Sequence, residues 1–155
     1  MNRREKKLGE ILVDKGIIGA AQLADALEEQ KATREFLGAI LVKKGYVKER
    51  DFLKALSEQF NIPLAGLKDV YIDWDFVKGF SPSLIIQNKC FPLKKDEWSV
   101  MIAITNPLDV WALKKAEEEA KGLKANFVLV SQEDMEEIIE RYRQFMRGTI
   151  SGMLG

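Results

Sequence analysis

Apolar side chains in the first sixty residues follow the spacing of amphipathic helices. Leu8, Ile11 and Leu12 keep the i, i+3, i+4 spacing that places side chains on one helix face, and the same spacing recurs along this part of the chain. We therefore predict four helices, over about 6–15, 20–32, 35–44 and 48–60.

This pattern is an internal repeat. Residues 8–30, LGEILVDKGIIGAAQLADALEEQ, recur 29 positions later as residues 37–59, LGAILVKKGYVKERDFLKALSEQ, and 11 of the 23 aligned positions are identical. Gly16 and Gly45 stand where the first helix of each copy should end, because glycine adopts the left-handed backbone of a helix C-terminus without strain. We predict two similar helix hairpins related by an approximate twofold, closed by Pro63 and Gly66.

Beyond Pro63 the pattern becomes mixed. Strands are predicted over 90–93, 98–104 and 125–130, with a polar turn over 94–97. Helices are predicted over 73–77, over 81–88 with Ser81 as N-cap, from 105–109 to about 121, and from Ser131 to about Met146. The expected fold class is α+β. A four-helix unit of two helix-hairpin repeats (1–62) precedes a small three-stranded α/β subdomain (63–146), and a flexible tail or truncated linker follows (147–155).

Composition and charge narrow the classes of function. With 46% hydrophobic and 31% charged residues among 155, the chain suits a soluble protein with one modest core or two small ones. No apolar run is long enough to span a membrane and the charged start does not resemble a signal peptide, so we expect a cytoplasmic protein. Lys plus Arg equals Asp plus Glu, 24 each, which argues against binding of a nucleic acid polymer.

The sequence lacks the motifs of common catalytic sites. It has no histidine, no G-x-x-x-x-G-K-[ST] phosphate loop and no G-x-G-x-x-G turn. Its single cysteine, Cys90, can form no internal disulfide and is expected to be a buried structural thiol. We therefore predict no catalytic residue, no metal ligand and no required cofactor.

Two features of the repeat exceed what packing of a helix hairpin requires. Gly9 and Gly38 fall inside helices, where glycine costs about 1 kcal/mol relative to alanine, so a close approach of a helix or of a ligand should compensate. Gln30 and Gln59 end each copy on its apolar side, where an amide needs a partner. Tight helix packing and contact with a ligand both remain open as explanations.

The doubled L-G-x-x-L-V-x-x-G-x-[IV]-x(4)-[LF]-x-x-A-L-x-x-Q resembles the tandem motifs of the MshE-type N-terminal domain, with residues 31–35 as the short spacer. Segments 67–73, 91–93 and 106–109 are similar to the N-terminal domain of the general secretion pathway protein E family. The resemblance covers about residues 6–145. It implies a non-catalytic adaptor of a type II secretion or type IV pilus assembly ATPase, which docks the motor domain to the cytoplasmic domain of an inner-membrane platform protein. Such a protein would be cytoplasmic, and peripheral at the inner membrane only through that partner.

In some members of this family the domain binds cyclic di-GMP across the two motifs, which is the alternative function that the resemblance implies. Members that bind it commonly have Arg directly before Leu-Gly, where this sequence has Lys7 and Phe36. Lysine keeps a charge for a phosphate but lacks the planar fork that contacts a guanine at two atoms. The ligand-binding residues that the resemblance implies are Lys7, Leu8, Gly9, Leu12, Leu23, Leu27, Gln30, Leu37, Gly38, Leu41, Phe52, Leu56, Gln59 and Asp109.

Overall fold

The computed structural model describes residues 3–154, with the side chains of residues 5 and 150–154 left out. The chain forms two compact units, Met1–Gln59 and Phe60–Gly155.

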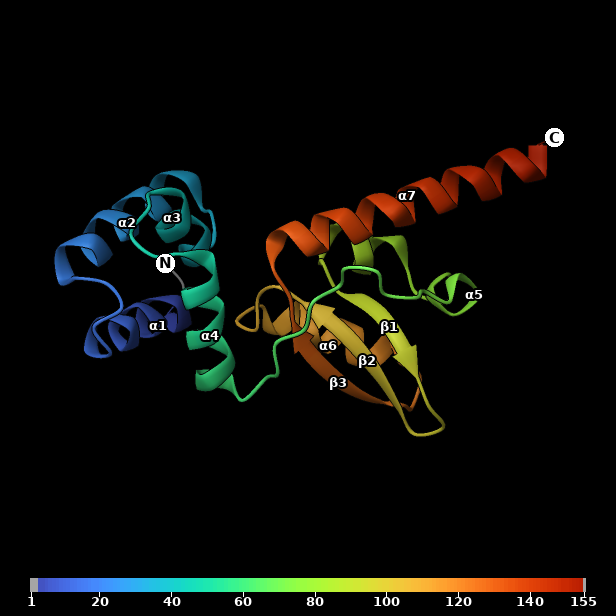
Figure 1. Ribbon diagram of the computed structural model, residues 1–155, viewed down its shortest axis with the longest axis horizontal. Helices are drawn as coiled ribbons and strands as arrows, with labels where there is room; N and C mark the ends of the chain where they lie inside the picture. The colour runs from blue at the N-terminus through green and yellow to red at the C-terminus, as the bar shows by residue number, and fades with distance from the viewer. Residues whose placement is uncertain (1–2, 155) are drawn as a thin grey trace. The chain divides into compact units, whose positions relative to one another are not determined.

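The first unit consists of helices, as predicted from the apolar spacing (Figure 1). They are α1 (Arg3–Asp14), α2 (Ala20–Thr33), α3 (Leu37–Lys43) and α4 (Glu49–Phe60). The turns after α1 and α3 contain Gly16 and Gly45 with φ of +74° and +76°, the left-handed conformation expected at a helix C-terminus. The two copies of the repeat therefore form the same helix, turn and helix.

The core of the first unit is made by the residues that set the repeat. Leu12, Leu37, Ile40, Leu41 and Leu56 have no exposed surface. Each comes from the apolar face of its helix, so the side chains meet in one interior. Burial of a leucine contributes about 2 kcal/mol, and this interior holds the short helices together.

The second unit is built on a three-stranded sheet of order β1-β2-β3. Strand β1 (Phe91–Lys95) pairs antiparallel with β2 (Ser99–Ile104), and β2 pairs parallel with β3 (Lys124–Leu129). The parallel pair is joined through helix α6 (Val110–Glu119). The segment before this unit's helices adds a short bridge to the sheet, because Leu129 donates its amide to the Pro63 carbonyl (2.8 Å) and accepts from the Ala65 amide (2.9 Å).

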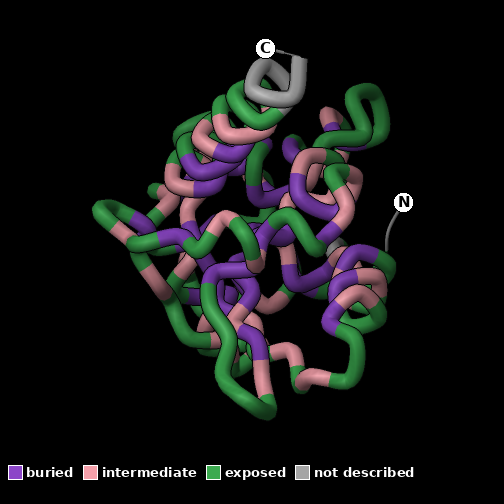
Figure 2. The backbone as a smooth tube through the Cα atoms, turned by 90° about the vertical axis from the view of Figure 1, so that its right-hand side faces the viewer, coloured by how far each residue is buried: buried purple, intermediate pink, exposed green. Residues whose placement is uncertain are grey.

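Two helices of this unit bury small or aromatic side chains. Helix α6 buries Ala112 and Ala116, whose small side chains allow close packing. Helix α7 (Gln132–Leu154) buries Met135, Ile138, Ile139 and Tyr142, and the Tyr142 ring meets Phe91 of β1 edge-on at 6.4 Å. Buried positions recur along the first turns of α7, whereas residues 147–149 are exposed (Figure 2).

The α+β class is confirmed, but several predicted boundaries are wrong. Helix α7 continues through Leu154, where a flexible tail or linker was expected beyond Met146. Lys94 and Lys95 extend β1 instead of starting a turn, after a bulge between Pro92 and Lys94. These lysines sit on an exposed strand end, so their polarity suggested a turn.

The short helices before the sheet also differ in detail from the prediction. Helix α5 spans Trp74–Val77, and η1 (Ser83–Gln87) is a π-helical turn in which the Asn88 amide reaches the Ser83 carbonyl at 3.1 Å. The Ser81 hydroxyl accepts from the Leu84 amide (3.1 Å), as expected of a residue that caps this turn. Within the described residues, no helix combines the length and apolar character that crossing a membrane requires.

Candidate functional site

The apolar candidates of the repeat lie together as the core of the helical unit. Leu27 is half-buried and the rest are nearly or fully buried, so the described conformation offers them to each other and not to a surface. The buried candidates are Leu8, Gly9, Leu12, Leu23, Leu37, Gly38, Leu41, Phe52 and Leu56.

The two helical glycines allow close packing of side chains. A Cβ atom at Gly9 would overlap the Leu23 side chain and come within 3.3 Å of Leu37 Cδ2. A Cβ atom at Gly38 would overlap Phe52 Cε1 and Cζ, and come within 3.0 Å of Phe36 Cε1. The close contacts at both glycines favour tight helix packing, one of the two explanations left open by the sequence.

The polar candidates do not share one environment. The Lys7 side chain is exposed on α1. Gln30 is buried, and its Nε2 donates to the Glu35 carbonyl at 3.1 Å. Gln59 is exposed, so the expectation that both glutamines lie on the apolar side is wrong for the second copy.

The chain after each glutamine explains this difference. After Gln30 the backbone turns at Arg34, with φ of +60°, and the Arg34 amide donates to the Gln30 carbonyl at 2.7 Å. That turn brings the Glu35 carbonyl to the Gln30 amide. Gln59 is the last residue of its unit, and no third copy of the repeat follows it.

Two further positions have structural partners. Phe36 packs edge-on against Phe52 with ring centres 6.1 Å apart. Asp109 belongs to the other unit, where its Oδ1 accepts from the Ala112 amide (3.1 Å) and caps α6. The helical candidates are thus brought together within one unit, whereas Asp109 has a capping role in the second.

A polar network that sequence reasoning missed ties α2 to the second glycine turn. Asp25 Oδ2 accepts from Lys44 Nζ at 2.7 Å and from the Tyr46 hydroxyl at 2.5 Å, and Lys44 lies 3.6 Å from Glu29 Oε2. The hydrogen bond from Lys44, followed by that from Tyr46, lowers the pKa of Asp25, and the same contact raises the pKa of Lys44. The signal was present in the repeat, because Asp25 and Tyr46 are positions where the two copies differ.

A cavity of about 620 Å³ is lined by both glycine turns of the helical unit, and Gly45, Tyr46 and Val47 contribute from the turn after α3. Lys15 and Ile17 line it from the turn after α1, and Lys54, Ala55 and Glu58 line it from α4. None of these residues was proposed as a ligand contact from the sequence.

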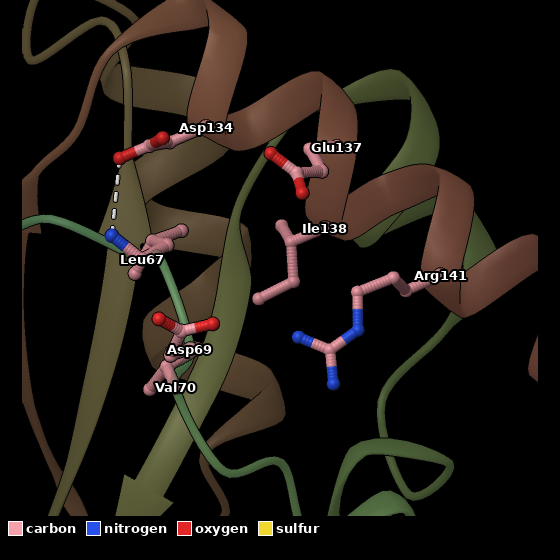
Figure 3. Close-up of a pocket in the computed structure, with 7 residues that line it drawn as sticks. All are labelled: Leu67, Asp69, Val70, Asp134, Glu137, Ile138 and Arg141. Carbon is pink, nitrogen blue, oxygen red and sulfur yellow. Dashed lines mark hydrogen bonds between the residues drawn. The ribbon is translucent and has the colours of Figure 1, made fainter.

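The second unit has a smaller cavity of about 400 Å³ between the segment before α5 and helix α7 (Figure 3). The Leu67 amide donates to Asp134 Oδ2 at 3.0 Å, which fixes that segment to the start of α7. Three carboxylates and the Arg141 guanidinium surround the cavity, so its charge is net negative. The lining residues are Leu67, Asp69, Val70, Asp134, Glu137, Ile138 and Arg141.

Large aromatic side chains of the second unit are exposed. Trp98 precedes β2 and is 79% exposed, and Trp111 in the first turn of α6 is 80% exposed.

Cys90 is buried as expected, and burial raises the pKa of its thiol to about 12. Among the side chains that the structure describes (residues 3–4 and 6–149), no group of three or more His, Cys, Asp or Glu is placed to hold a metal ion.

Comparisons with known proteins agree with this architecture. The MshEN domain family model matches residues 60–149. The type IV pilus assembly ATPase PilB of Myxococcus xanthus is 29% identical over 136 residues, which are 88% of this chain and 24% of that protein. The PilB of Thermus thermophilus is 32% identical over 117 residues, 74% of this chain and 13% of that protein. The chain thus spans less than a quarter of the length of either ATPase.

Solved structures share the fold over most of the chain. A structure of MshE with cyclic di-GMP (cdg) has a TM-score of 0.76 at 27% identity, and the match covers 87% of this chain and 97% of that one. The N-terminal domain of XpsE has a TM-score of 0.68 at 21% identity, covering 91% of this chain and 98% of that one, and supports the fold alone.

Proposed function

The chain belongs to the MshEN domain family, and on this basis we propose that it is the non-motor domain of a type IV pilus assembly or type II secretion ATPase, which docks the motor to the cytoplasmic domain of an inner-membrane platform protein. The relatives are whole ATPases of which it matches a part. The sequence itself contains no phosphate-binding loop, so hydrolysis would belong to the motor domain. The domain would then be cytoplasmic and reach the inner membrane through its partner.

The observation that carries the docking role is the exposure of Trp98 and Trp111. Tryptophan is among the residues that contribute most to the binding energy of protein interfaces. The two residues flank β2 in the sequence, at its start and beyond its end, so they offer two separate places for a partner to contact.

Binding to platform proteins tests this role. The chain is titrated with the cytoplasmic domains of the inner-membrane pilus and secretion proteins encoded by the same genome. We expect one of them to bind, and Trp98→Ala or Trp111→Ala to weaken it about thirtyfold, which corresponds to about 2 kcal/mol for the loss of a central interface side chain. Lys121→Ala, an exposed change in the same unit, serves as the control. Binding to none of these domains would contradict the role.

A second candidate function is reception of cyclic di-GMP by the helical unit. It is favoured by the doubled motif and by the similarity to MshE with that ligand. Lys7 and Gln59 have exposed side chains that a ligand can contact, whereas Phe36 is packed on Phe52 and supplies no charge. We therefore propose weak binding that depends on Lys7 for the phosphate charge.

Isothermal titration of the chain with cyclic di-GMP tests this second function. Lys7→Arg restores the planar fork and should tighten binding severalfold, equivalent to about 1 kcal/mol for a recovered charged hydrogen bond. Gln59→Ala should weaken binding with an unchanged melting curve, because its side chain is exposed. Gln30→Ala is a poorer probe, since it also removes the buried bond to Glu35. No heat at high micromolar ligand for wild type and Lys7→Arg alike would exclude the receptor role.

A further inference from the structure

The two glycine turns of the repeat are built alike. Lys15 and Lys44 are counterparts at the repeat offset of 29 residues, and each directly precedes a glycine with positive φ. Gly16 donates its amide to the Val13 carbonyl at 2.9 Å, and Gly45 donates to Val42 at 3.0 Å. Backbone geometry therefore presents the two lysines in the same way.

The second turn is closed by a carboxylate from within the unit. Asp25 of α2 receives both the Lys44 ammonium (2.7 Å) and the Tyr46 hydroxyl (2.5 Å). At the second turn, Lys44 and Tyr46 therefore bind the carboxylate of a helix aspartate, Asp25.

The first turn has the same lysine but lacks the carboxylate. The counterpart of Asp25 is Lys54, and the counterpart of Tyr46 is Ile17. Lys15, Ile17 and Lys54 line one cavity of about 620 Å³, together with Gly45, Tyr46 and Val47 of the second turn. Within the described part of the chain, neither the Lys15 nor the Lys54 ammonium has a hydrogen bond or an ion pair.

We propose that Lys15 and Lys54 hold a carboxylate from an acidic, partly apolar segment of a partner protein, in the role that Asp25 has at the second turn. This inference rests on the proposed docking function and names the chemistry of one docking segment. An apolar neighbour of the acidic residue would pack on Ile17 and on Ala55, which lie beside the lysines in the same cavity.

The other charges around the cavity are compatible with an incoming carboxylate. Lys48 adds a third cation, while Asp51 and Glu58 oppose it, so the lining carries a net charge of about +1. Glu58 is the counterpart of Glu29, which lies 3.6 Å from Lys44 while Lys44 also holds Asp25. The second turn therefore already accommodates a carboxylate beside a glutamate.

The test uses a blocked hexapeptide with Asp-Glu at its centre and leucines beside them, and a twin with Asn-Gln in place of Asp-Glu. Both are titrated into the ¹⁵N-labelled full chain, and amide shifts are followed by NMR. We expect the acidic peptide to shift the amides of residues 15–17 and 51–58 with saturation in the millimolar range, as for an exposed ion pair, and the neutral twin to bind at least about fivefold more weakly.

Variants taken from the second copy of the repeat sharpen the test. Lys54→Asp places a carboxylate where Asp25 stands in the closed turn, and Ile17→Tyr in addition supplies the hydroxyl. Both variants should fold and lose the response to the acidic peptide, because the site is then filled from within. Lys6→Asp is the control, an equal charge change on an exposed helix position of the same unit, and should keep the response.

Equal shifts with both peptides, or an unchanged response in Lys54→Asp, would overturn the inference. Inorganic phosphate that saturates these amides when the acidic peptide does not would also overturn it. The proposed function fails separately: it fails if no platform domain binds the wild-type chain, whatever the peptide does. If a platform domain binds wild type and Lys54→Asp equally well, docking stands and the lysine site is refuted.

Discussion

Replacing Gly38 by alanine measures how tightly the second copy of the repeat is packed. The new Cβ would overlap Phe52 Cε1 and Cζ, and lie 3.0 Å from Phe36 Cε1. Phe52 is only 4% exposed, so its ring has little room to move. Such overpacking costs about 1–3 kcal/mol, and alanine regains about 1 kcal/mol of helix propensity. With a rigid aromatic ring as the obstacle, we expect a net loss of about 1–2 kcal/mol in the free energy of unfolding of the helical unit.

The first copy of the repeat supplies the matched comparison. At Gly9 the atom in the way is Leu23 Cδ1, the end of a flexible side chain, so Gly9→Ala should cost less than Gly38→Ala. Leu23 is the counterpart of Phe52, and the double variant Gly38→Ala/Phe52→Leu therefore copies the first arrangement into the second. Part of the loss should return in this variant, beyond the sum of the two single changes.

The assay has to separate the two units of the chain. All three tryptophans (Trp74, Trp98 and Trp111) belong to the second unit, so tryptophan fluorescence follows its unfolding alone. Hydrogen exchange of amides in residues 3–59 reports on the helical unit. Gly38→Ala should accelerate exchange there and leave the fluorescence transition unchanged. The reasoning is refuted if Gly38→Ala exchanges like wild type, or if Phe52→Leu brings no recovery.

Three other predictions concern single groups. Asp25→Asn should destabilise the helical unit near pH 7. Because the pKa of Asp25 is lowered in the folded state, this difference from wild type should be present above pH 4 and vanish as the pH falls through the folded pKa; a melting difference that persists at pH 2 would contradict the network. Asp109→Ala should cost the second unit about 1 kcal/mol through loss of the α6 cap, with Asp109→Asn close to wild type in tryptophan-detected unfolding. Cys90, 1% exposed and with a pKa of about 12, should resist iodoacetamide at pH 8 until the chain is denatured, and stoichiometric labelling of the native protein would show that its burial is wrong.

The helical unit could be predicted from sequence because its signal is doubled. Apolar spacing and the glycines at 16 and 45 recur in both copies, so each copy supports the interpretation of the other. The end of α7 could not be predicted in this way. Residues 147–149 near its end have no buried side chain. Apolar periodicity predicts a helix only where one face is buried, so it gives no signal there.

The candidate site was harder to predict, because the positions that are identical in the two copies are mostly positions of the hydrophobic core. Leu12, Leu41 and Leu56 are shared positions, and the structure buries them completely. Contacts that occur in only one copy involve positions where the two copies differ, such as Asp25 and its counterpart Lys54. Gln30 and Gln59 are identical residues with different exposure, since only the chain after Gln30 folds back over its amide.

The sheet of the second unit has a consequence for how other chains can associate with it. Strand β1 lies at one edge, where Pro92 has no amide hydrogen to donate and the adjoining bulge interrupts the ladder. At the opposite edge, the segment at Pro63–Ala65 occupies the Leu129 end of β3. Each edge therefore has an interruption in the row of backbone donors and acceptors that it could offer to a foreign strand. These interruptions disfavour extension of the sheet by another chain at both of its edges.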